Sequence, residues 1–428
     1  MNGKEAVNYC LSSLKNAGIN KATCSLTNSE KKELNVEIGE MTLLRTTYNS
    51  SMGISIIKDS KKGSTSINKT DKKSIDTAID EVIQMANASQ PDDAYDISKT
   101  QPKQFFSKGD EIANLDTMYK YLEEFVDYVK STYPKIQLEA AIMDFNHTRS
   151  FYQNTNGVEF EIRDGIYSFS PMFLSKDEKN TSSFNYTGFS ALNINKPLYE
   201  YGTVNMLLKQ SVEQLETKNL NNKFIGKMLV TPDCITDFIS FITNDISDSK
   251  MISGNSIYKD SLNKKITDSK LTLHSMPISE QIEDGYYITG DGYVAKNLTI
   301  INEGVLKSHL LGVYGANKLN SKRAVNDGGA LIVDPGNKTH NNIIKNIDKG
   351  ILLSRFSGGY PSANGDFSGV AKNSYYIENG EIKYPISETM VSGNIKKMFE
   401  NINEISSDRI NFGSTILPWI LFDGITVS

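Results

Sequence analysis

Residues 365–395 read GDFSGVAKNSYYIENGEIKYPISETMVSGNI, and their turn signals decide how the surrounding chain is interpreted. Within them, Asn379-Gly380 stands between Tyr375-Tyr376-Ile377-Glu378 and Glu381-Ile382. An Asn-Gly pair favours the tight turn between two antiparallel strands, because both residues tolerate the positive φ angles that this turn needs. Together with the glycine-rich segments around it, this hairpin signal predicts a β-rich C-terminal part.

A strand followed directly by a helix is predicted ahead of this stretch. Residues 224–230, FIGKMLV, are typical of a buried strand, and Thr231-Pro232 begins a helix that we expect to run to about Ser247. A hydroxyl residue caps a helix well, and proline fits the first turn, where its missing N–H costs nothing. Residues 265–315 are predicted to be strand-rich, with glycine-containing turns. We therefore assign residues 221–428 to a β-rich C-terminal domain.

Two similar successions of elements are predicted in the first half of the chain. Apolar residues at helical spacing predict helices over 4–17 and 71–88, with short strands between them. The same order of helix, strands and helix is predicted again over 116–217. The stretch 89–114 holds two prolines and many polar residues, which is typical of a linker or a long surface loop. We predict an α+β N-terminal domain with an internal duplication, with these bounds: domain 1–220, repeats 1–90 and 115–218.

Composition narrows the class of protein. The chain has 428 residues, 38% of them hydrophobic, and a formal net charge of −5, so no basic surface points to nucleic acid. The start is polar, and no apolar run approaches the roughly 18 residues of a membrane span. Three cysteines without metal-ligand spacing suit a reducing compartment. We expect a cytoplasmic protein that binds neither nucleic acid nor membrane.

Several motifs, taken in order, resemble one known family. GDFSG at 365–369, YIENGEIKYP at 376–385 and VSGN at 391–394 are similar to the C-terminal signature of the TldD/PmbA family. GISI at 53–56 and NEGVL at 302–306 match earlier parts of the family pattern. Each motif is weak alone, but their order and spacing make the resemblance specific and extend it over nearly the whole chain. It implies an α+β, two-domain TldD/PmbA-like architecture.

The resemblance also bears on metal binding. TldD-type members carry HExxxH on a helix and a later cysteine, which together hold zinc. In this chain the helix beginning at Pro232 has Ser240 and Asp245 at the histidine positions and Phe241 at the glutamate position. A hydrolytic zinc site needs about three protein ligands and a water. The chain is therefore identified as a PmbA-type, or TldE-type, member without catalytic or metal-binding residues of its own.

Four residues are candidates for the lining of a peptide cleft: Asp366 and Phe367 of the C-terminal signature, and Gly358 and Gly359 just before it. Glycines leave room for a peptide backbone to approach closely, although a plain loop would use them equally well. Asp366 could line the cleft or cap a turn, and the turn is the favoured interpretation.

The family resemblance implies a function in a complex. We expect a non-catalytic subunit of a two-component metallopeptidase that acts on unfolded or modified peptides, with zinc carried by a TldD-type HExxxH partner. The association would be a heterodimer or a homodimer, with the C-terminal half contributing much of the contact. Two alternatives stay open: a homodimeric peptide-binding protein without a catalytic partner, and a self-sufficient peptidase with an unrecognised site. The older family label, modulator of DNA gyrase, has no support in these residues.

Overall fold

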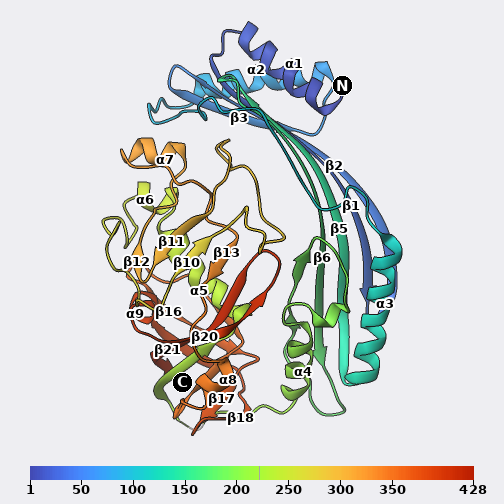
Figure 1. Ribbon diagram of the computed structural model, residues 1–428, viewed down its shortest axis with the longest axis vertical. Coiled ribbons are helices and arrows are strands. Elements are labelled where there is room, and N and C mark those ends of the chain that lie inside the picture. Colours follow the sequence, from blue (N-terminus) through green and yellow to red (C-terminus); the bar gives the residue numbers. More distant parts are fainter. Residues whose placement is uncertain (221) are drawn as a thin grey trace.

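Two sheets, one in each half of the chain, organise the computed structural model, which describes residues 1–220 and 222–428 (Figure 1). The elements of the N-terminal half are α1 Gly3–Asn16, β1 Lys21–Glu37, β2 Glu40–Lys58, β3 Lys61–Ile67, α2 Lys72–Ala88, β4 Gln104–Lys108, α3 Leu115–Thr132, β5 Ile136–Asn154, β6 Glu159–Ser175, β7 Asn185–Tyr186, β8 Phe189–Ala191, the 3₁₀ helix η1 Leu198–Glu200 and α4 Val204–Glu213.

The C-terminal half holds most of the strands. Its elements are β9 Phe224–Val230, α5 Pro232–Asp245, α6 Asp248–Ile252, β10 Leu273–Ser275, β11 Leu298–Asn302, β12 Val305–Leu306, α7 Val313–Lys318, β13 Leu331–Val333, α8 His340–Ile344, β14 Lys349–Leu353, β15 Arg355–Gly358, β16 Asp366–Lys372, β17 Tyr375–Glu378, β18 Glu381–Pro385, β19 Thr389–Asn394, α9 Ile395–Glu400, β20 Ile402–Asn411 and β21 Ile416–Val427. The predicted α+β class with a β-rich C-terminal half is confirmed.

The N-terminal sheet has the strand order β3-β2-β1-β5-β6-β4, antiparallel except for the β4–β6 pair, and β7 and β8 also pair with β6. Figure 1 shows these strands curving, with α1, α2 and α3 on the outer side and the C-terminal half on the inner side. Apolar side chains of α1 and α2 pack on one end of the outer face, and those of α3 pack on the other end. The curvature therefore leaves the inner face turned toward α5 and its neighbours.

A succession of helix, strands and helix occurs twice in this half, as α1-β1-β2-β3-α2 and as α3-β5-β6-β7-β8-η1-α4. The first strands of the two successions, β1 and β5, pair antiparallel in the middle of the sheet, with Glu33 opposite Asp144. This order agrees with the predicted arrangement, but common descent of the two units stays a prediction. The proposed domain boundary after residue 220 also stays a prediction, since residue 221 lies outside the described residues.

Three stretches differ from what their sequence suggested. The predicted linker 89–114 contains β4, which pairs parallel with β6 through Phe105 and Phe106. The strands expected between the first two helices are short, whereas β1 has 17 residues and β2 has 19, and their hairpin extends through the polar sequence of 27–33 and 45–51. Within 265–315, the strands β10, β11 and β12 are short and separated by irregular chain. Among the described residues, no helix is long and apolar enough to cross a membrane.

The C-terminal sheet converges on β21, which pairs antiparallel with β9, β19 and β20 and parallel with β13. Helix α5 follows β9 directly, as expected, and begins at Pro232 after the extended residue Thr231. It ends at Asp245, two residues before the expected end at Ser247, which is the N-cap residue of α6. Its apolar face enters the main core of this half, where Phe238 is completely buried. The other face of α5 stays at the surface and carries the predicted motif positions.

Candidate functional site

Ser240, Phe241 and Asp245, the three positions matched to the HExxxH motif, lie apart on the surface side of α5. Phe241 and Asp245 line a cavity of about 360 Å³ at the C-terminal end of the helix. Ser240 is not among the residues that line it; its backbone carbonyl accepts a hydrogen bond from the Thr243 hydroxyl at 3.3 Å. In a regular helix, positions five residues apart point about 140° away from each other, which accounts for this separation.

We call this cavity the α5 pocket. It is assembled from α5, α6, the segment after α6, the loop that precedes β16 and the start of α9. Its lining residues are Phe241, Ile242, Asn244, Asp245, Ser247, Ser249, Lys250, Asn255, Ile257, Tyr258, Tyr360, Pro361, Ser362, Ala363, Gly365 and Ile395. The Tyr360 ring, 88% exposed, meets Phe241 edge-on with 6.0 Å between centroids, so aromatic surface stands in open solvent at the pocket.

Asp245 is already engaged by the protein. Its Oδ2 atom accepts hydrogen bonds from the Ser256 hydroxyl at 3.1 Å and from the backbone N–H of Ile257 at 2.7 Å. The carboxylate thereby fixes the segment that forms one wall of the α5 pocket. With a hydroxyl at position 240 and an aromatic ring at position 241, these side chains do not fit a zinc ion, which takes three nitrogen, sulfur or carboxylate ligands at a hydrolytic site.

The wall formed by Ile257 and Tyr258 is held from both sides. The Tyr258 side chain is 2% exposed, and its buried hydroxyl has no hydrogen-bond partner among the described residues. Burial, with a smaller contribution from the charge of Asp245, raises the pKa of this hydroxyl. The Tyr258 carbonyl lies 3.3 Å from Nε2 of His309, whose pKa is lowered by burial. This wall is therefore formed before any ligand arrives.

The signature loop before β16 forms the opposite side of the pocket. Asp366 accepts hydrogen bonds from the side-chain amides of Asn394 and Asn364, each at 2.8 Å, and these bonds lower its pKa. Its backbone N–H donates to the Ser362 hydroxyl at 3.1 Å. These contacts close a turn in which Gly365 has a φ of 91°, a conformation that suits glycine. Asp366 thus positions the loop, whose residues 360–363 and 365 line the pocket.

Phe367, Gly358 and Gly359 occupy three different environments. Phe367 is 5% exposed and packs against Phe238 and Phe356 in the core, so its side chain does not face solvent. A Cβ atom on Gly358 would come within 2.5 Å of the Phe356 ring, whereas one on Gly359 would meet nothing within 4 Å. Gly358 ends β15, which pairs with β16 along one edge only among the described strands. After Gly358 the chain continues through Gly359 to Tyr360, which lines the α5 pocket.

The four histidines have separate surroundings. His147 lies on β5, His274 contacts Thr299 and Asp334, His309 faces the Tyr258 carbonyl, and His340 contacts Asp408 and stacks on Trp419. Over residues 1–220 and 222–428, no group of three or more histidine, cysteine or acidic side chains is arranged to hold a metal ion.

A second cavity, of about 490 Å³, lies at the other end of α5, between the two halves of the chain. Its lining combines the inner face of β6, the β7–β8 segment and the turn between β20 and β21 with Asp233 and Thr236 of α5. Asp233 accepts hydrogen bonds from the hydroxyls of Thr203 at 2.6 Å and Thr187 at 3.0 Å, and burial raises its pKa. This carboxyl ties α5 to the N-terminal half.

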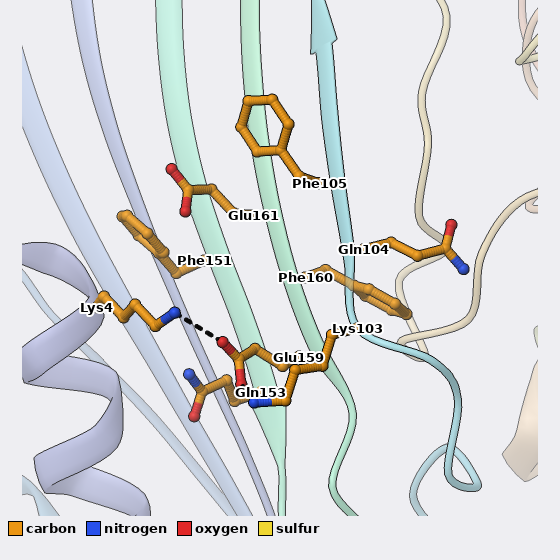
Figure 2. A pocket seen from close by; sticks show the side chains of 9 residues that line it. All are labelled: Lys4, Lys103, Gln104, Phe105, Phe151, Gln153, Glu159, Phe160 and Glu161. Carbon is orange, nitrogen blue, oxygen red and sulfur yellow. Dashed lines mark ion pairs between the residues drawn. The ribbon is translucent and has the colours of Figure 1, made fainter.

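A third cavity, of about 240 Å³, opens on the sheet of the N-terminal half beside α1 and is shown in Figure 2. Glu159 lies between Lys4 at 2.9 Å and Lys103 at 2.6 Å, and these contacts lower its pKa. Figure 2 shows Phe151 beside this charged group, whereas Phe105 lies farther along the sheet near Glu161, its partner in the β4–β6 pairing. Since its charges are paired with one another, the arrangement fastens α1 to the sheet and offers less free surface than the α5 pocket.

The structure therefore brings Phe241, Asp245 and the signature loop together, while Ser240 and Phe367 lie elsewhere. Sequence reasoning missed Tyr258, Ile257 and Ile395 as pocket residues. They lie far from the motif along the chain, and each stands in an ordinary apolar context, so no local pattern distinguishes them from core residues.

Comparison with known proteins adds two kinds of finding. Residues 226–428 match the family description "PmbA/TldA metallopeptidase C-terminal domain", and residues 23–86 match "PmbA/TldA metallopeptidase domain 1". A "Metalloprotease PmbA homolog" of Buchnera aphidicola is 30% identical, over 51% of this chain and 52% of that protein. The alignment thus spans about half the length of that relative.

Two further comparisons extend over almost the full length. A "Metalloprotease PmbA homolog" of Haemophilus influenzae is 21% identical over 99% of this chain and 96% of that protein. The crystal structure of TldE from Thermococcus kodakarensis superposes with a TM-score of 0.84, covering 99% of this chain and 100% of that one at 16% identity. At this identity the structural likeness establishes the shared fold.

Proposed function

The chain belongs to the PmbA/TldD family of metallopeptidase-related proteins, and from that membership we propose that it is the peptide-binding, non-catalytic subunit of a two-component peptidase. The second component would be a TldD-type homologue that carries zinc on its HExxxH helix. The complex would work in the cytoplasm on unfolded or modified peptides.

The proposal is supported chiefly by the contacts of the two motif positions on α5 that reach the pocket. Phe241 lines an open pocket, and Asp245 holds the pocket wall through Ser256 and the Ile257 amide. These side chains serve a binding surface, and they do not supply the ligands that activate water. The chemistry of peptide hydrolysis would thus come from the partner, while this chain would bind and orient the substrate.

The free edge of β15 offers a way to hold an extended peptide. Its backbone groups on that side have no partner strand among the described residues, and Gly358 and Gly359 project no side chains over it. An added strand would gain main-chain hydrogen bonds independent of sequence, as in other cases of strand addition. Unfolded chains would bind in this way, whereas folded proteins could not.

Co-purification followed by a peptidase assay tests the proposal. A tagged form of the chain would be isolated from its native cell, its partners identified, and peptide cleavage measured for each component alone and for both together. We expect an HExxxH homologue to co-elute and chelator-sensitive cleavage only when both are present. Cleavage by this chain alone would favour a self-sufficient peptidase. Peptide binding by a homodimer, with no such homologue recovered, would favour the binding protein without a catalytic partner.

A further inference from the structure

We propose that the α5 pocket is a selectivity pocket that receives one large apolar side chain, aromatic or branched aliphatic, from an extended peptide. The inference rests on the proposed peptide-binding function and specifies the class of substrate. It concerns this chain's own residues, so the non-catalytic subunit would choose which peptides are held.

The chemistry of the lining favours an apolar group. Phe241, Ile257 and Tyr360 come from three separate segments and present apolar surface, and Ile242, Pro361 and Ile395 extend it. Pockets of this kind gain affinity mainly by removing apolar surface of the ligand from water. A small or charged side chain would gain little of that stabilisation.

The charged groups of the lining do not change this preference. Asp245 and Lys250 both line the cavity and carry opposite charges, so for any charged side chain the attraction of one is offset by the repulsion of the other. Asp245 is also engaged by two hydrogen bonds at its Oδ2 atom. A charged side chain of either sign would have to give up its water against mostly apolar walls.

The size and rigidity of the cavity fit a single side chain. Its volume of about 360 Å³ is near the lower limit of small-molecule sites, which range over about 300–1,000 Å³. The wall is preformed, because Tyr258 donates its backbone N–H to the Ser256 hydroxyl at 3.1 Å and the Asp245 carboxylate holds the neighbouring residue. A preformed pocket spends little free energy on ordering when the ligand arrives.

The position of the pocket links it to the peptide path. The chain passes from the free edge of β15 through Gly358 and Gly359 directly to Tyr360, which lines the pocket. Side chains of an added strand point alternately to its two faces. One residue of a peptide on β15 would therefore direct its side chain toward α5 while its neighbours faced away.

Binding of a matched peptide series to the purified complex tests this inference. Fluorescently labelled, uncharged host peptides would differ at one position, occupied by Phe, Leu, Ala, Asp or Lys, and anisotropy would report their affinities. We expect the Phe and Leu peptides to bind about tenfold or more tightly than the Ala, Asp and Lys peptides, since burial of one large side chain is worth at least that factor. In Ala363→Phe, a new ring at an exposed lining position should fill the pocket and reduce this preference to less than about threefold.

The control is Ala88→Phe, which places the same ring on an exposed residue at the end of α2, far along the chain from the pocket lining. It should keep the preference of the unaltered protein. Equal binding of the Phe and Ala peptides, a preference for Asp or Lys, or an unchanged preference in Ala363→Phe would overturn the pocket assignment alone. Failure of every peptide to bind would overturn the proposed function together with this inference.

Discussion

Asp164 on β6 is a partly buried carboxyl at the contact between the two halves of the chain. Burial raises its pKa from 3.8 to about 6, against the opposing charge of Lys108 and with a further increase from Asp284 in the C-terminal half. Lys108 reaches the same contact and donates to the Ile282 carbonyl at 2.5 Å, and burial lowers its pKa. Here the fold holds a carboxyl group whose neutral form is favoured by its surroundings.

The first prediction is that Asp164→Asn stabilises the protein at neutral pH. The pKa of Asp164 in the folded state lies above its unfolded value. The contribution of protonated Asp164 to the free energy of unfolding is therefore fully present below about pH 4 and is lost as the pH rises through about 6. An amide cannot ionise, so the variant avoids that loss, which amounts to at most about 3 kcal/mol. Urea unfolding at about pH 4 and about pH 7.5 would measure it. The exposed Asp127→Asn serves as control, and a variant less stable than the parent at neutral pH would contradict the assignment.

The second prediction concerns Phe238, whose ring lies among Phe241, Phe356 and Phe367. Phe238→Ala would leave a cavity where α5 meets β15 and β16, and should lower the free energy of unfolding by about 3–5 kcal/mol. Phe241→Ala removes the same atoms from a partly exposed position, so its cost should be clearly smaller. Denaturant titration of both variants provides the comparison. Equal losses would mean that the pocket side of α5 is as tightly packed as its core side.

At the scale of elements, the sequence predicted those parts whose signals are local. The start of α5 at Pro232 and the Asn379-Gly380 hairpin both depend on a few adjacent residues, and both are found. β4 was missed because Gln104–Lys108 is a strand only through its nonlocal, parallel pairing with β6. The polar half of β2 was missed because both of its faces are exposed, which leaves no alternation to detect.

The candidate site was also predictable only where its signals are local in the sequence. The motif positions on α5 and the signature loop could be found from the sequence, because family motifs and turn residues mark them. The pocket itself could not, since Tyr258 and Ile395 reach it from segments that pack together only in the folded chain. The inward direction of Phe367 was equally hidden, because an alternating strand does not reveal which of its faces is covered.

The third prediction tests α5 as an element. The unaltered chain should hold no stoichiometric zinc, and Ser240→His, Phe241→Glu and Asp245→His together should still give no peptide hydrolysis without a partner. In a regular helix the two new histidines would point about 140° apart, and Cys234, the last cysteine, is buried in α5. Loss of Asp245 would also release the pocket wall. Elemental analysis and a chelator-controlled peptidase assay are the measurements, and chelator-sensitive cleavage by the triple variant alone would contradict the supporting role.

At the scale of the whole molecule, the N-terminal sheet ends in an edge that no described part of the chain covers. β3 pairs with β2 only from Met52 onward, so the segment Glu40–Ser51 has a free edge. Residues 40–49 are all exposed, including Leu44 at 59% and Tyr48 at 73%. Proteins usually protect such an edge with lysine, proline, a bulge or a covering element, because an open row of backbone groups pairs with other strands.

The last prediction is that the chain forms a two-fold dimer, or a pseudo-two-fold dimer with its TldD-type homologue, and that the free edge of β2 contributes to it together with the C-terminal half. Sedimentation velocity at micromolar concentration should show the dimer for the unaltered chain. Leu44→Lys with Tyr48→Lys should weaken it at least about tenfold, because two apolar side chains that the dimer would bury are replaced by charged ones that must keep their water. Tyr119→Lys, which changes a 48% exposed side chain on α3, is the matched control. A monomer under all conditions would refute the dimer, whereas a dimer unaffected by the β2 substitutions would restrict the contact to the C-terminal half. In either case the edge of β2 would need another explanation, since no strand of this chain is placed to cover it among the described residues.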